Sequence, residues 1–236
     1  GIRGRGDDGN MKVATCGLFA VWMVVGGAWG AASYLSPEYV AVAPDGKTIY
    51  VTAATAGKLL TFDGASAKPS GGWGLRCNPS GVAVAADGTV YVTGGGVDGL
   101  LLKLSPAGKV LGKVATGHTP LSPVVGRDGA TVYVLNRFNN AVVAVDAATM
   151  KVTATVGALR EPHAAVLGAG GKLLFVANHL PACKATDDVV AAAVSVIDTA
   201  TFKVVKNVML PNGSTGVRGI GASPDGKSVY VTHTFG

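Results

Sequence analysis

Residues 223–232 read Ser-Pro-Asp-Gly-Lys-Ser-Val-Tyr-Val-Thr, and this stretch decides the fold because variants of it recur along the chain. Each variant has a turn of the Asp-Gly type followed by an aromatic residue and a short apolar strand. The variants occupy residues 45–52, 87–93, 128–135, 170–177 and 225–232, and their aromatic residues are spaced by 41, 42, 42 and 55 residues, at Tyr50, Tyr91, Tyr133, Phe175 and Tyr230. A period of about 40–45 residues with several short strands in each repeat is typical of propeller blades.

Four strands can be read inside one repeat. In the third repeat they are expected at residues 123–125, 131–135, 141–145 and 151–156. The Asp-Gly turn joins the first two strands, because Gly and Asp tolerate the positive φ of a tight hairpin. A second turn follows the third strand of four repeats, at Asp63, Ser105, Asp146 and Asp198. The pattern predicts an all-β protein, a β-propeller of four-stranded antiparallel blades.

The number of repeats predicts an open ring. We expect a propeller over residues 33–236, with blades near residues 37–78, 79–119, 120–161, 162–216 and 217–236. About four and a half blades leave unpaired strand edges that a closed ring removes. We therefore expect an incomplete propeller, a fragment of a ring of about seven blades.

The repeats resemble the YVTN-type β-propeller repeats of bacterial and archaeal surface and secreted proteins. The resemblance is carried by residues 223–232 and by Val-Ser-Val-Ile-Asp-Thr-Ala at 194–200. Residues 133–136, Tyr-Val-Leu-Asn, depart from the name motif at one position. The resemblance covers residues 37–236, and it implies the fold more strongly than a function. The Gly-His and Trp-Asp dipeptides of WD-repeat proteins are missing, although the two families share one superfamily.

Composition excludes several classes of protein. The chain is 48% hydrophobic and only 14% charged, with 35 glycines, which is the profile of a globular protein and not of a disordered one. Its net charge is +6, but the positive residues are scattered and form no Lys/Arg block. This pattern argues against a nucleic-acid partner.

The N-terminal segment has the pattern of an export signal. Residues 1–10 precede the first methionine, Met11, and are interpreted as upstream read-through. Residues 11–32 have a short positive start, an apolar run and a stretch of small residues, as a signal peptide does. We expect a periplasmic, extracellular or cell-surface protein that is not integral to the membrane after cleavage. The alternative is a start further upstream with a membrane-anchored tail.

One end of the predicted disk gathers the residues of chemical interest. A proline lies eight residues before the Asp-Gly turn in four repeats, and Val217 takes its place in the fifth. The next residue starts the innermost strand beside the central channel, and these residues are Glu38, Ser80, Leu121, His163 and Arg218. The loops between the second and third strands reach the same end of the disk. All four histidines of the chain fall there.

This cationic, histidine-bearing channel mouth is the candidate binding site. Its predicted ligand-binding residues are Arg76, His118, Arg137, Arg160, His163, His179, Arg218 and His233. Such a site suits an anionic ligand, a metal ion or a haem propionate. The alternative is that the histidines only cap carbonyls in tight loops. The identity of a metal stays open, because the histidines come from different blades.

Cysteine usage fits an exported protein. Cys16 would leave with the signal, so Cys77 and Cys183 remain. A disulfide between them is one prediction, and pairing with a part outside this stretch is the other. There is no Cys-x-x-Cys-His motif, so we expect no cofactor in this fragment, with haem left open for the full-length protein. The fourth repeat also has an insertion at residues 181–190, and loops that outgrow a repeat often lie on a binding face.

Two functions remain in competition. The first is a secreted scaffold or binding module that holds a protein or an anionic small ligand at the Arg/His end. The second is the propeller domain of a periplasmic haem- or quinone-linked oxidoreductase or electron-transfer protein, because similar propellers include such dehydrogenases and nitrite-reductase-type domains. A lactonase-like hydrolase ranks last, because only Glu38 supplies a carboxylate at the mouth. No catalytic residue can be assigned, and whether the chain is an enzyme stays open.

Overall fold

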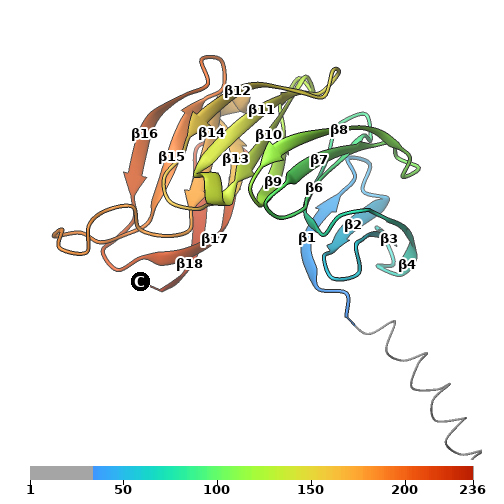
Figure 1. Ribbon diagram of the computed structural model, residues 1–236, viewed down its shortest axis with the longest axis horizontal. Helices are drawn as coiled ribbons and strands as arrows, with labels where there is room; N and C mark the ends of the chain where they lie inside the picture. The colour runs from blue at the N-terminus through green and yellow to red at the C-terminus, as the bar shows by residue number, and fades with distance from the viewer. Residues whose placement is uncertain (1–33, 236) are drawn as a thin grey trace, which may run out of the picture. The chain divides into compact units, whose positions relative to one another are not determined.

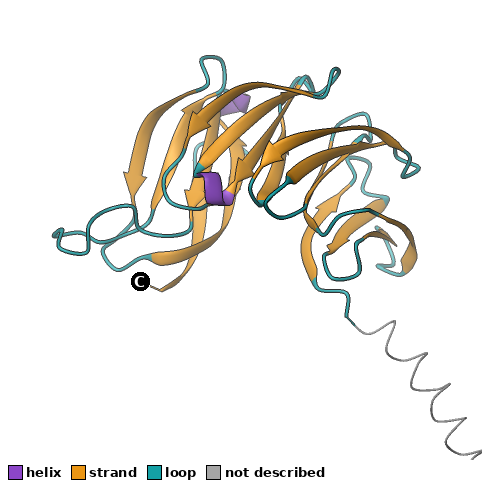
Figure 2. Ribbon diagram, viewed as in Figure 1, coloured by secondary structure: helices purple, strands orange, loops and turns teal. Residues whose placement is uncertain are grey.

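The computed structural model describes residues 34–235 of the chain (Figure 1). Strands make up 57% of these residues and helices 3% (Figure 2). The predicted read-through at 1–10 and the predicted signal at 11–32 lie outside the described residues. Within the described part, none of the helices has the length and hydropathy of a membrane span.

Four antiparallel sheets have four strands each, ordered in space as in the sequence, and a fifth has two. The first two sheets comprise β1 (Pro37–Val42), β2 (Thr48–Ala53), β3 (Lys58–Asp63), β4 (Pro69–Gly74), β5 (Pro79–Val84), β6 (Val90–Gly94), β7 (Gly99–Leu104) and β8 (Val110–Gly117). The third and fourth comprise β9 (Pro120–Val125), β10 (Thr131–Asn136), β11 (Ala141–Asp146), β12 (Lys151–Gly157), β13 (Pro162–Gly168), β14 (Leu173–Asn178), β15 (Ala193–Asp198) and β16 (Lys203–Met209). The fifth comprises β17 (Thr215–Ala222) and β18 (Val229–Phe235); two short 3-10 turns, η1 (Arg137–Asn139) and η2 (Ala169–Gly171), complete the elements.

The sheets are arranged as successive blades. The first strand of each sheet, from β1 through β5, β9 and β13 to β17, packs against the first strand of the next (Figure 1). Hydroxyl groups reinforce two of these contacts: Ser80 Oγ donates to the Pro120 carbonyl at 2.5 Å, and the Ala165 amide donates to Ser122 Oγ at 3.1 Å. The structure confirms the predicted fold class, an incomplete β-propeller of four-stranded antiparallel blades.

The recurring aromatic residue lies at one register position in every sheet. Tyr50 faces Ala41 and Thr61, and Tyr133 faces Val124 and Ala144 in the corresponding place. Tyr50, Tyr91 and Tyr133 are each at most 5% exposed, because each packs into the sheet that follows. Tyr230 is 65% exposed, since no later sheet covers it among the described residues.

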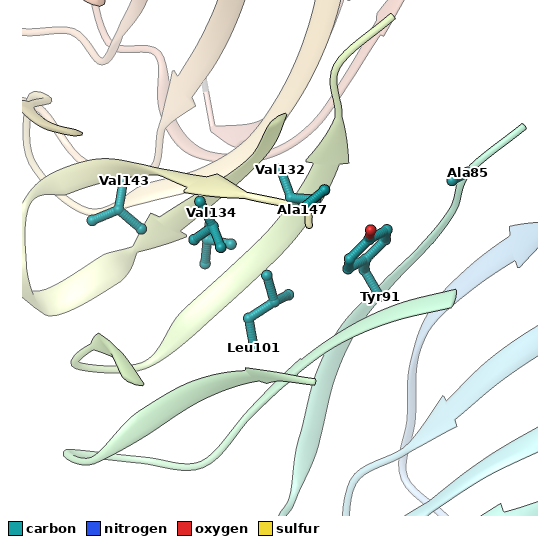
Figure 3. Close-up of a cluster of buried hydrophobic side chains, with 8 residues drawn as sticks. Ala85, Tyr91, Leu101, Val132, Val134, Val143 and Ala147 are labelled. Atoms are coloured by element: carbon teal, nitrogen blue, oxygen red, sulfur yellow. The ribbon is translucent and has the colours of Figure 1, made fainter. Parts of the chain in front are cut away.

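The core lies between the sheets. Between the second and third sheets, Tyr91 and Leu101 belong to one buried cluster with Val132, Val134 and Val143 (Figure 3). Leu101, Val132 and Val134 are fully buried. Burial of a Val or Leu side chain is worth about 1.5–3 kcal/mol, so these contacts hold one blade against the next.

The turn between the third and fourth strands contributes to the same interfaces. Asp63 and Asp146 start this turn, and each accepts hydrogen bonds from the hydroxyl and the amide three residues later. Those hydrogen bonds hold the pKa of each carboxyl below its usual value. In the fourth sheet the turn presents Phe202, at φ 51°, which stacks on Tyr133 at 5.8 Å.

In the second sheet, the turn between the third and fourth strands supplies no side chain to stack on the preceding tyrosine. This turn carries Gly108, at φ 79°, in the place of an outward side chain. Trp73 from β4 of the preceding sheet fills the space and stacks on Tyr50 at 6.2 Å. A Cβ atom on Gly108 would overlap the Trp73 ring, whereas a Cβ on Gly46, at φ 71°, would meet no atom within 4 Å.

Two alanine substitutions separate backbone strain from this clash. Gly46→Ala should destabilise the fold by about 1 kcal/mol, because positive φ is unfavourable for alanine. Gly108→Ala carries the same cost and also overpacks Trp73, which adds about 1–3 kcal/mol. Urea unfolding of the full chain measures both free energies, and equal losses would contradict the proposed role of Trp73.

Candidate ligand-binding site

A repeated hydrogen bond builds one end of the propeller. The residue that follows the second strand donates its amide to the carbonyl of the residue before the repeat's proline. The distance is 3.1 Å from Arg137 to Thr119 and 2.8 Å from His179 to Glu161. Ala54 and Gly95 make the same bond in the first two sheets. The loop between the second and third strands is therefore fixed beside the loop between blades.

A cavity of about 480 Å³ opens at this end. It is lined by the five residues that the repeat alignment places at one equivalent position of the innermost strands: Glu38, Ser80, Leu121, His163 and Arg218. Arg137 and Tyr39 also line it. We call this space, with these seven residues, the channel-end cavity. Tyr39 spans it, because its hydroxyl donates to the His163 carbonyl of the fourth sheet at 3.3 Å.

His163 is the half-buried imidazole of this cavity. Its ring stacks on His179 with 5.2 Å between ring centres, and its buried Nδ1 has no hydrogen-bond partner. Burial, together with the positive charges of His179, Arg137 and Arg218, lowers the pKa of His163 from 6.5 to about 4, and Glu161 opposes this shift. His163 is therefore neutral at pH 7, and it can donate a hydrogen bond to a ligand, or accept one, without placing a positive charge in the cavity.

Arg137 is held in place by an ion pair. Its Nη2 and Nε both donate to Glu161 Oε2, at 2.7 and 3.0 Å. Its guanidinium also lies 5.0 Å from the centre of the Phe138 ring. The two side chains are only 27% and 17% exposed, so solvent screens the pair less than it would at the open surface. The role of Glu161 is not predictable from the repeat pattern, because nothing in that pattern marks the residue before the proline as a partner for Arg137.

The remaining predicted residues do not line the channel-end cavity. His179 lies behind His163, and its Nδ1 donates to the Val217 carbonyl at 2.8 Å. His118 packs on Phe138 with 5.0 Å between ring centres. His233 is exposed, with its Nδ1 bonded to the Phe235 carbonyl at 2.8 Å, and Arg160 is exposed without lining the cavity. For His179 and His233, capping of a carbonyl is the observed role.

Arg76 belongs to a separate groove. This groove of about 300 Å³ lies between the first two sheets and is lined by Arg76, Cys77, Leu100, Leu102 and neighbouring residues. It shares none of its lining with the channel-end cavity. The structure therefore places Arg76 apart from the residues that line the channel-end cavity.

Within residues 34–235, Cys77 and Cys183 are free thiols, so this part of the chain lacks the predicted disulfide between them. Cys77 packs against the apolar core between the first two sheets, and burial raises the pKa of its thiol. Cys183 lies in the long connection between β14 and β15, and its thiol is 3.9 Å from the Ala191 carbonyl. The two residues belong to blades that do not adjoin, which explains why a shared end of the disk does not bring them together.

The histidines do not form a metal centre in the described part of the chain. Residues 34–235 contain no group of three His, Cys, Asp or Glu side chains placed to hold a metal ion. Only His163 and His179 contact each other, and the Nδ1 of His179 is already bonded. The donor set therefore does not fit a metal held by several imidazoles.

Comparisons with known proteins support the fold and leave the family open. No protein-family model and no curated protein matches the chain. Many solved structures do match, among them hydrazine synthase of Kuenenia stuttgartiensis, with a TM-score of 0.76 and 23% sequence identity. The match covers 86% of this chain and 56% of that one, so the chain spans little more than half the length of its structural neighbour. At this identity the likeness concerns the fold alone.

The depressed pKa of His163 predicts acid sensitivity in a defined pH window. The unfolded chain binds the His163 proton near pH 6.5 and the folded chain only near pH 4, so stability falls as pH drops between these values. The full shift corresponds to about 3 kcal/mol, and solvent screening in the open cavity reduces the effect to about 1–2 kcal/mol. Urea unfolding measures how much free energy of unfolding is lost between pH 7 and pH 4.5, and this loss should be smaller in His163→Asn than in the wild type. His118→Asn is the control and should lose as much free energy as the wild type. A loss in His163→Asn equal to that of the wild type would contradict the assignment.

Proposed function

We propose that this chain is a ligand-binding propeller whose channel-end cavity takes a small anionic ligand. The observation that carries this proposal is the convergence of Arg137, Arg218 and neutral His163 on one cavity. Its volume of about 480 Å³ falls in the range of about 300–1,000 Å³ that is typical of small-molecule sites. As parts of the same proposal, the repeats are of the YVTN type and the protein acts outside the cytoplasm after export.

Arg218 is the principal anchor in this proposal. Its guanidinium forms no ion pair within residues 34–235, whereas Arg137 already gives two donors to Glu161. A free guanidinium can hold a carboxylate or phosphate through two parallel hydrogen bonds. Arg137 is neutralised by Glu161, but it keeps donors that the ion pair does not use, and it does not have to be ordered when the ligand binds.

Removal of the Arg218 guanidinium should abolish most of this binding. Charged hydrogen bonds of this kind contribute about 1.5–3 kcal/mol, so Arg218→Gln should weaken binding by at least about 10-fold. Isothermal titration of the full chain with acetate, succinate, sulfate and phosphate at low ionic strength measures the effect. Arg160→Gln is the matched control, because it removes an exposed arginine that does not line the cavity. Equal affinity in Arg218→Gln and the wild type, or binding of no anion at all, would refute the proposal.

A second candidate is the propeller domain of a redox protein. It is favoured by the histidines at the channel end, and the structural neighbour named hydrazine synthase shares the fold. The described residues offer this candidate His163 as the one imidazole lining the cavity. An absorbance spectrum of the protein expressed with haem supply separates the candidates. A Soret band that shifts in His163→Asn would favour the redox protein. A spectrum without a Soret band would favour the binding module.

A further inference from the structure

Two side chains of opposite charge line the channel-end cavity without pairing. Glu38 comes from β1 in the first sheet and Arg218 from β17 in the fifth. Neither forms an ion pair with the other or with any other described residue. Glu38 is the only carboxylate and Arg218 the only guanidinium at the five equivalent positions of the innermost strands. The other three sheets supply Ser80, Leu121 and His163 there.

The other charged groups of the cavity are already neutralised. Arg137 is balanced by Glu161 at 2.7 Å, and His163 is neutral at pH 7. The uncompensated charges are therefore one carboxylate and one guanidinium. A ligand with only a negative charge gains from Arg218 but is repelled by Glu38, because both line the same space.

A cation on the ligand would be favourable at Glu38. This side chain is exposed, but partial loss of solvent in the cavity still raises the pKa of its carboxylate above the usual value, and the carboxylate has no ion-pair partner among residues 34–235. The neighbouring Tyr39 is partly buried and donates its hydroxyl hydrogen to the His163 carbonyl, so Tyr39 does not supply that partner. A positively charged group on a ligand would.

We infer that the channel-end cavity takes a zwitterion, a small molecule whose anionic group binds Arg218 and whose ammonium group binds Glu38. Free amino acids and similar amino carboxylates are the chemical class that this pair of charges selects. The inference rests on the proposed function and adds a second contact to it. The cavity of about 480 Å³ has room for a molecule of this size.

Matched ligands test the role of the ammonium group. Alanine and propionate share one carbon skeleton and differ in the ammonium group, and so do glutamate and glutarate. In isothermal titrations of the full chain at pH 7.5, each amino acid should bind at least about 5-fold more tightly than its partner acid. In Glu38→Gln the ratio should fall to about 1, while the affinity for the plain acids stays the same or increases.

Control variants separate failure of this inference from failure of the proposed function. Asp98→Asn removes an exposed carboxylate from the loop between β6 and β7, at the same end of the disk, and should keep the wild-type ratio. Arg218→Gln should weaken the binding of both the amino acid and the plain acid of each pair. If the plain acids bind in an Arg218-dependent way but the amino acids bind no better, the zwitterion inference is overturned and anion binding stands. If neither ligand binds, both proposals fail.

Discussion

Burial of one sheet face against the next is the constraint on which this structure depends. A four-stranded sheet has two apolar faces, and in this chain Tyr50, Tyr91 and Tyr133 pass from one sheet into the core of the following one. The innermost strands of successive sheets therefore pack side by side, and five residues far apart in the sequence line one cavity.

The site inherits its chemistry from this arrangement. Each blade contributes one side chain at an equivalent position, so the charge of the cavity is set residue by residue: a carboxylate, a hydroxyl, an apolar group, an imidazole and a guanidinium. The loops after the second strands then add Arg137 and the supporting ring of His179. Because the backbone there is held by a repeated amide-to-carbonyl hydrogen bond, these side chains are presented from a rigid frame.

The features that depend on the repeat register alone can be predicted from the sequence. The strands at 131–136 and 141–146 and the five cavity positions follow from turn chemistry and spacing. The first strand of the third sheet was expected at 123 but begins at Pro120, because Ser122 takes φ 43° within a register shift and interrupts the alternation. Glu161 and Tyr39 escaped notice, because their roles depend on how far a side chain reaches between sheets. Cys77 and Cys183 are not joined in the structure, since a common end of the disk does not fix distance around the ring.

Tyr50 stacks on Trp73 and not on a side chain of the next turn, and this difference limits how the blades of such a chain can be recombined in evolution. Tyr133 receives its stacking partner, Phe202, from the following repeat, whereas Tyr50 receives Trp73 from its own repeat and faces Gly108 in the next. The stacking partner of Tyr133 thus lies 69 residues further along the chain, whereas the partner of Tyr50 lies 23 residues away in the same repeat and needs a glycine 35 residues after it. A gene duplication that placed a copy of the second repeat after the third would bring glycine to Tyr133 and leave a void there. Recombination can therefore shuffle these blades only in neighbouring pairs that keep both partners of each contact together.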